Sequence, residues 1–215
     1  MTDLMEAPTK IRLVYGFGVN DADYHTQPLD HDTGKQVICP VSKRWRNMLK
    51  RVYYPTDLAR HPTYIDATIC DEWRSFMAFR GWYLEQEAVL GDLSDLDLDK
   101  DILIAGNKHY SPETCVFVTH AVNLLLKDGG AARGRWPPGV FQATSSGRFF
   151  AQLKRAGKTC YLGMYNTAEE AARAYRTGKA RHVREAARGL ANTRPDVAAG
   201  LMRHADLILM EEGVA

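Results

Sequence analysis

The 215-residue sequence contains no apolar run long enough to cross a membrane, and its N-terminus lacks the apolar core of a signal peptide. Its four cysteines are widely spaced and include no Cys-x-x-Cys pair, which argues against a disulfide framework. Hydrophobic residues at 45% and charged residues at 25% are typical of a globular chain. We therefore expect a soluble, cytoplasmic protein without a membrane partner, long enough for one large or two small domains.

The sequence also has little net charge, +2, but that charge is unevenly distributed. Residues 131–188 contain twelve Lys and Arg against three Asp and Glu, a net charge of +9, whereas residues 1–130 carry −5. Such an asymmetry favours a nucleic-acid-binding segment in the basic part of the chain. Double-stranded DNA is therefore the partner that we expect.

The basic segment contains three short alternating runs, at 139–144, 148–154 and 159–165. Ser-Ser-Gly and Ala-Gly separate them, and both are typical of hairpin turns. A helix start follows at Asn166 or Thr167, with two glutamates in the first turn. The pattern predicts a three-stranded antiparallel sheet followed by one helix.

Strand alternation divides the middle run into two faces. Phe149, Ala151 and Leu153 share one face, and the small Ala151 allows an alanine-rich helix to approach it closely. The opposite face is basic, polar and aromatic. A three-stranded sheet can lie in the major groove and read base edges with such a face.

This segment resembles the Apetala-two/ethylene-response-factor type of DNA-binding domain. The resemblance rests on Gly139-Val140, Gly147-Arg148-Phe149-Phe150-Ala151, Gly157-Lys158, Tyr161-Leu162-Gly163, Thr167-Ala168-Glu169-Glu170-Ala171-Ala172 and Ala174-Tyr175. It implies that six side chains face DNA, namely Phe141, Arg148, Phe150, Gln152, Lys154 and Tyr161. Three further basic residues are candidate phosphate or base contacts: Arg135, Arg155 and Lys158.

The first strand departs from that family, whose plant members carry more arginines there. Phe141 and Ala143 occupy these positions, so the resemblance implies no base specificity. The alternative for the segment is a small α+β protein-interaction module with a solvated basic face.

Two segments of the N-terminal half show helical spacing of apolar residues. In 41–60 the apolar positions are Val41, Trp45, Met48, Leu49 and Val52, surrounded by basic residues. This pattern fits a surface helix with a buried Trp, and also a basic helix laid along phosphates. In 64–82 a short strand leads to Cys70, and the helix after it packs Trp73, Phe76, Phe79 and Trp82.

Residues 96–127 are predicted to form strand, loop, strand and helix, with the second strand at Cys115–Thr119 and the helix at His120–Lys127. Gly129-Gly130 would end this helix and open a linker. Phosphodiester hydrolysis needs a base that activates a water molecule. It also needs neutralisation of the charge on the scissile phosphate, which a divalent metal held by hard oxygen ligands can supply. An Asp ending the first strand and an Asn on the helix can converge on one ion in this arrangement, which makes Asp99 and Asn123 candidates.

At this point the sequence resembles the phage-type HNH (His-Me finger) endonucleases, including homing endonucleases. The resemblance covers about residues 43–126 and rests on Trp45, Asn47-Met48-Leu49, Arg51, Tyr64, Cys70-Asp71-Glu72-Trp73, Phe76, Phe79, Leu98-Asp99, Gly106-Asn107, Tyr110-Ser111-Pro112-Glu113, Cys115, Thr119 and Asn123. It implies that Asp99 and Asn123 hold Mg²⁺ or Mn²⁺ and that Asn107 takes the central-loop position.

One departure from this family bears on catalysis. Its general-base His follows the first Asp, whereas here Lys100 follows Asp99, and a protonated Lys cannot accept a proton. His109 and His120 are the substitutes available. The candidate catalytic residues are therefore Asp99, Asn107, His109 and His120.

We therefore expect an α+β protein with an N-terminal extension at 1–40, an HNH-like ββα-metal nuclease domain at 41–128, an Apetala-type domain at 131–188 and a helical tail at 189–215. The expected function is a metal-dependent DNA endonuclease of the phage HNH homing type.

Lys100 favours an alternative function, a catalytically decayed scaffold that acts as a DNA-binding or regulatory protein. A protein-binding inhibitor of a host enzyme is a third possibility. A structural zinc on Cys39, Cys70 and Cys115 is not favoured, because these cysteines include no Cys-x-x-Cys pair. The tail can form an amphipathic helix that packs on the domain or mediates self-association, with apolar positions Val197, Leu201, Ala205, Leu207 and Ile208.

Overall fold

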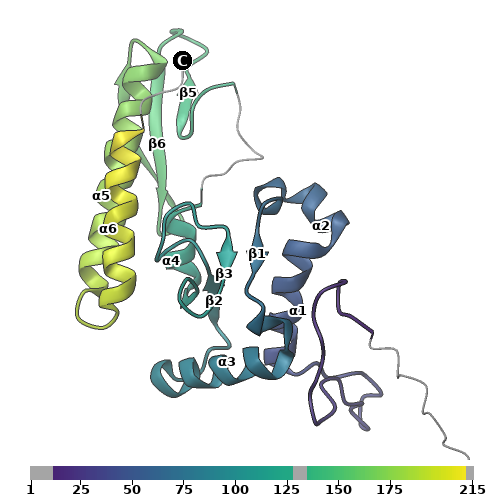
Figure 1. Ribbon diagram of the computed structural model, residues 1–215. Coiled ribbons are helices and arrows are strands. Elements are labelled where there is room, and N and C mark those ends of the chain that lie inside the picture. The colour runs from purple at the N-terminus through teal and green to yellow at the C-terminus, as the bar shows by residue number, and fades with distance from the viewer. Residues whose placement is uncertain (1–11, 128–134, 212–215) are drawn as a thin grey trace, which may run out of the picture. The chain divides into compact units, whose positions relative to one another are not determined.

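The computed structural model describes residues 12–127 and 135–211 (Figure 1). The chain is a mixed α+β protein, as predicted, with its strands in small sheets of two or three. It divides into two compact units. Unit 1 comprises Met1–Ser94 and Lys108–Glu113, and unit 2 comprises Asp95–Asn107 and Thr114–Ala215. Among the described residues, no helix is both long and apolar enough to cross a membrane.

Unit 1 is built around a core of aromatic side chains. Its helices are α1 (Pro40–Tyr53), α2 (Pro55–Arg60) and α3 (Phe76–Leu90), with 3₁₀ turns at Pro62–Tyr64 and Glu72–Arg74 and a parallel strand pair, β1 (Thr68–Ile69) with β3 (His109–Tyr110). The predicted aromatic core is confirmed, because Trp73, Phe76, Phe79 and Trp82 are buried, and Trp45 is buried as well. The indole Nε1 of Trp45 donates to the Trp73 carbonyl at 2.8 Å, which joins α1 to the turn before α3.

The helix predicted over 41–60 is two helices. Tyr54 is extended, and Pro55 begins the second helix, because a residue before proline is driven out of the helical region. The predicted buried face of the first helix is confirmed in the side chains of Met48, Leu49 and Val52.

Both strands and the helix predicted within residues 96–127 are present in unit 2, whereas residues 108–113 of the predicted loop belong to unit 1 and contain the short strand β3. Strand β2 (Leu96–Asp99) pairs antiparallel with β4 (Val116–Thr119), and α4 (His120–Leu125) follows directly. The helix ends two residues earlier than predicted. The expected linker at Gly129-Gly130 lies outside the described residues.

The sheet and helix predicted for the basic segment are also present. Strands β5 (Val140–Gln142), β6 (Phe149–Arg155) and β7 (Lys158–Tyr165) form an antiparallel sheet, and α5 (Ala168–Leu190) follows. Thr167 and Glu170 form a capping box at the start of α5. Ala151 is fully buried among the alanines of α5, as the alternation predicted.

The C-terminal tail belongs to the core of unit 2. Helix α5 extends past the predicted segment, and α6 (Pro195–Met210) folds back along it (Figure 1). The buried face of α6, Val197, Leu201 and Ala205, packs in one cluster with Ile102, Val116 and Val118 of the ββα segment. Of the two roles left open for the tail, packing on the domain is therefore observed.

Residues 95–107 and 114–127, which we assigned to a nuclease domain at 41–128, share unit 2 with the C-terminal sheet and helices. The functional domain boundaries themselves stay a prediction.

Candidate functional site

The first candidate site lies where β2 meets α4. The Thr119 hydroxyl caps α4 by accepting the Val122 N–H. This cap fixes the first turn, so His120 and Asn123, three residues apart, lie on one helix face. Both reach Asp97 on the neighbouring strand. His120 Nδ1 lies 2.8 Å from Asp97 Oδ2, and Asn123 Nδ2 donates to the same oxygen at 2.9 Å.

These contacts determine the charge of Asp97. Burial raises the pKa of this carboxyl group, but the hydrogen bonds from His120 and Asn123 offset burial and bring the pKa below its ordinary value. An ionised Asp97 accepts hydrogen bonds, so His120 Nδ1 is the donor. The neutral imidazole then has Nε2 as its acceptor, on a side chain that is 67% exposed. The pair can therefore take a proton from a water molecule.

Asp99 is half-buried, and it holds the turn that follows β2. Its Oδ1 accepts the backbone N–H groups of Asp101 and Ile102 at 2.7 and 2.8 Å. Burial raises the pKa of this carboxyl group, and the two hydrogen bonds offset only part of that effect. A nearby cation would favour its ionised form.

Lys100 is buried, at 5% exposure, and it closes the loop between β2 and β3. Its Nζ donates to Asp101 Oδ1 at 2.6 Å and to the Asn107 carbonyl at 2.9 Å, and Asn107 Nδ2 donates to the Lys100 carbonyl at 2.8 Å. The residue that replaces the expected base is therefore a hydrogen-bond donor that locks Asn107 in place.

The two histidines proposed as substitute bases belong to different units and have different neighbours. His109 belongs to β3 in unit 1, where its Nδ1 lies 2.8 Å from Thr68 Oγ1. His120 belongs to unit 2 and is the one beside Asp97 and Asn123. Asp97 was not named as a candidate from the sequence, although it lies two residues before Asp99 on the same face of β2. Its partners depend on the pairing of β2 with β4, which the sequence does not show.

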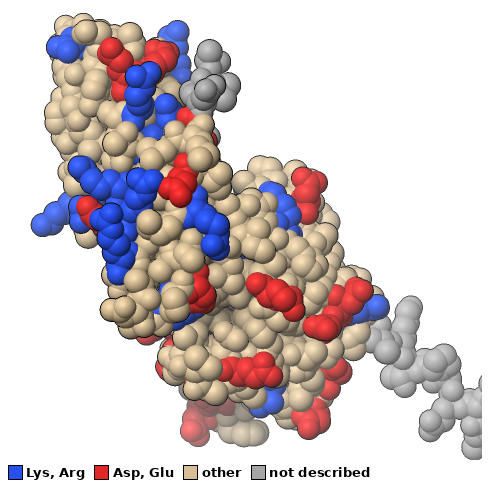
Figure 2. Space-filling model, turned by 60° about the vertical axis from the view of Figure 1, so that its left-hand side comes forward, with Lys and Arg blue, Asp and Glu red and all other residues tan. Residues whose placement is uncertain are grey.

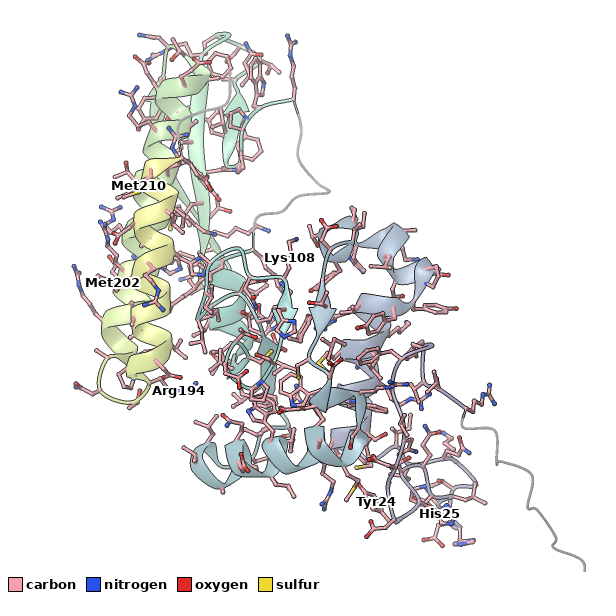
Figure 3. The ribbon with its side chains drawn as sticks, in the orientation of Figure 1. Tyr24, His25, Lys108, Arg194, Met202 and Met210 are labelled. Carbon is pink, nitrogen blue, oxygen red and sulfur yellow. The ribbon has the colours of Figure 1, made fainter. Side chains whose placement is uncertain are left out.

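Arg194, labelled in Figure 3 near the turn between α5 and α6, binds the backbone of β4. At the start of α6, its Nη1 donates to the Phe117 carbonyl at 2.8 Å, and its Nη2 pairs with Asp196 at 3.1 Å. The tail thus helps to position the strand that leads into His120.

The side chains on this site fit a hard divalent cation in donor type. Asp99 and Asn123 supply oxygen atoms, the ligand type of Mg²⁺ and Mn²⁺, and Asn123 keeps its Oδ1 while Nδ2 bonds Asp97. Within residues 12–127 and 135–211, no group of three or more His, Cys, Asp and Glu is placed to hold an ion.

The cysteines considered for zinc are free thiols. Cys39 and Cys70 lie in unit 1 and Cys115 lies in unit 2. Burial raises the pKa of the Cys70 thiol, which disfavours the thiolate that zinc binds.

The second candidate site is the sheet face turned away from α5. Phe141 and Phe150 stack with ring centroids 5.4 Å apart, and Phe150 lies 6.3 Å from Tyr161. Tyr161 is 61% exposed and Phe141 42%, although both are large apolar side chains. Gln152 and Lys154 continue this face along β6, with Arg148 exposed at its start.

The remaining basic candidates lie around this face or behind it. The Arg135 guanidinium lies 5.1 Å from the ring centroid of Trp136. Lys158 is exposed where β7 begins. Arg155 forms an ion pair of 2.7 Å with Glu185 of α5, so it reaches the helix side of the sheet.

Comparisons of this chain with protein families, with curated proteins and with solved structures found no match.

Proposed function

We propose that this chain is a metal-dependent DNA endonuclease of the HNH homing type, which hydrolyses phosphodiester bonds in double-stranded DNA. The observation that carries the proposal is the contact of His120 with Asp97 beside Asn123. A histidine oriented by a carboxylate can activate water. The resemblance alone did not choose between His109 and His120 for this role.

In the proposed reaction, His120 Nε2 accepts a proton from the attacking water. Asp97 holds the imidazole by its Nδ1–H and stabilises the imidazolium that forms. Asn123 fixes the same carboxylate oxygen, and Asp99 and Asn123 provide oxygen atoms for a divalent cation. When bound, such a cation supplies charge neutralisation at the scissile phosphate.

A plasmid-cleavage assay with Mg²⁺, Mn²⁺ or EDTA tests this activity. His120→Gln is expected to lower the cleavage rate about 10²–10⁴-fold, the range of a lost general base. Asp97→Asn and Asp99→Ala should also lower it. His109→Gln is the matched control, because this histidine lies on β3 beside Thr68. Cleavage by His120→Gln at the wild-type rate would refute the assigned base.

DNA binding is proposed for the sheet face, and two adjacent basic residues test which side of the sheet is used. Lys154 lies on the aromatic face, whereas Arg155 pairs with Glu185 behind it. Lys154→Ala should reduce the slope of log affinity against log salt by about 1, the effect of one lost phosphate contact. Arg155→Ala should leave the slope unchanged. Equal loss in both variants would contradict binding through this face.

The second candidate function is a DNA-binding protein without catalysis. Lys100 favours it, because a buried ammonium group bonded to Asp101 and Asn107 occupies the position after Asp99. This function predicts intact plasmid under every metal condition together with a salt-sensitive gel shift.

A further inference from the structure

An open groove of about 530 Å³ lies between β7 and α5 of unit 2, and no residue of either candidate site lines it. Its helix wall consists of residues on one face of α5 between 170 and 181. Its strand wall consists of Leu162 and Tyr165. A volume of this size is within the range of about 300–1,000 Å³ that is typical of small-ligand sites.

The floor of the groove is apolar and closely packed. A Cβ added to Gly178 would lie 2.9 Å from Leu162 Cδ1, so the glycine allows α5 to approach the strand. The small side chain of Ala174, one turn earlier, also leaves space above the floor. The floor can therefore receive a flat apolar group.

Tyr165 is the aromatic residue of the strand wall. Its hydroxyl donates to the Leu162 carbonyl at 2.9 Å. A Cβ at Gly163 would lie 2.8 Å from the same hydroxyl, so the side chain lies over that glycine. Leu162 is the extra residue where the register of β6 and β7 shifts, and the tyrosine hydroxyl satisfies its carbonyl.

Two arginines flank the floor on the helix side. Arg173 and Arg181 are eight residues apart on one helix face, which places them about 12 Å apart along the axis. Glu170 also lines the groove, but its carboxylate accepts the N–H groups of Asn166 and Thr167 in the capping box. It is thereby held at the start of the helix.

These two arginines have no acidic partner among the described residues, unlike other arginines of the same unit. Arg155 pairs with Glu185, and Arg184 pairs with Asp206. Figure 2 shows many Lys and Arg side chains on the surface of unit 2 (upper left), with several Asp and Glu side chains between them. The groove thus combines the guanidinium groups of Arg173 and Arg181 with an apolar floor and the aromatic ring of Tyr165.

We propose that this groove binds a short single strand of nucleic acid. The guanidinium groups of Arg173 and Arg181 take phosphates on either side, because their planar forks match phosphate oxygens. An intervening base lies on the floor against Leu162 and Tyr165, the combination of basic groove and aromatic contact typical of single-strand sites. This site is distinct from the sheet face proposed for duplex DNA.

Fluorescence anisotropy with a labelled thymidine hexanucleotide tests this site on the full chain, beside a labelled duplex. Arg173→Ala with Arg181→Ala should weaken single-strand affinity at least about tenfold, as expected for losing two charged contacts. Duplex affinity should change by less than about threefold under the same salt. The matched control is Arg176→Ala with Arg188→Ala, which removes the same charge from other positions of α5. It should change neither affinity by more than about threefold.

Equal effects of the two double variants on the hexanucleotide would overturn the proposal, because only overall charge would then matter. An unchanged single-strand affinity in the groove variant would also overturn it. So would preferential binding of an acidic Glu/Leu peptide that requires Arg173 and Arg181, since the occupant would then be a protein. Duplex binding and cleavage are measured separately from hexanucleotide binding. If the chain lacked both but still bound the hexanucleotide, the proposed endonuclease function would fail and the groove proposal would stand.

Discussion

Gly200→Ala is the sharpest test of how the C-terminal helix supports the candidate nuclease site. A Cβ added at Gly200 would lie 2.2 Å from the carbonyl oxygen of Ile102, against about 3.4 Å for ordinary contact. The clash is with backbone, so α6 or the loop after β2 must move by about 1 Å. Two hydrogen bonds hold the loop against α6 at this point: Arg203 donates to Leu103 O and His204 to Asp101 O, each at 2.8 Å.

The magnitude follows from three contributions. Overpacking costs about 1–3 kcal/mol. Each weakened hydrogen bond costs up to about 1 kcal/mol. Replacing a helical glycine with alanine stabilises the helix by about 1 kcal/mol, which offsets part of this cost. We expect a net loss of about 1–3 kcal/mol in the free energy of unfolding. The proposed cleavage activity should also fall, because Asp99 is bonded to this loop and Asn107 lies in it.

Urea unfolding followed by far-ultraviolet circular dichroism measures this loss. Gly189→Ala in α5 is the matched control, because a Cβ there meets nothing within 4 Å. It should be neutral or stabilising by up to about 1 kcal/mol. If Gly200→Ala were as stable as Gly189→Ala, the close packing of α6 on the loop would be refuted.

Two further predictions concern local hydrogen bonds. Thr167→Ala removes the hydroxyl that accepts the Glu170 N–H at 3.2 Å, so urea unfolding should show a loss of about 1 kcal/mol that Thr167→Ser restores. Hydrogen bonds from His120 and Asn123 hold the pKa of Asp97 below its ordinary value in the folded protein. Its ionised form therefore stabilises the fold above the ordinary pKa, and this contribution is lost as pH falls through the lowered pKa. The melting temperature of wild type should therefore fall more steeply below about pH 4 than that of Asp97→Asn, and parallel curves would contradict the assigned role of this carboxylate.

Much of the local structure could be predicted because its determinants lie close together in the sequence. The sheet of β5, β6 and β7 follows from alternation and turn glycines, and the start of α5 follows from Thr167 and Glu170. The buried face of Ala151 and Leu153 follows from strand parity. Pro55 shows the limit of periodicity, since helical spacing over 41–60 did not reveal the break between α1 and α2.

The candidate site was predicted in part. Asn123 and His120 were named from the sequence, but Asp97, which joins them, was not. Asp99 was named as a metal ligand, and its Oδ1 also holds the following turn. The contacts of Asp97 depend on strand register and join side chains 23 and 26 residues apart, which no periodicity encodes.

The sequence by itself determined the α+β class, the order of the elements and the faces that they bury, because each depends on residues within one or two turns of each other. Only the tertiary structure decided which distant elements meet. It placed α6 on the loop after β2 through Gly200 and Ile102, Asp97 beside His120, and Arg155 beside Glu185. The physical reason is that such contacts depend on how whole surfaces fit together, and a single added methyl group can prevent them.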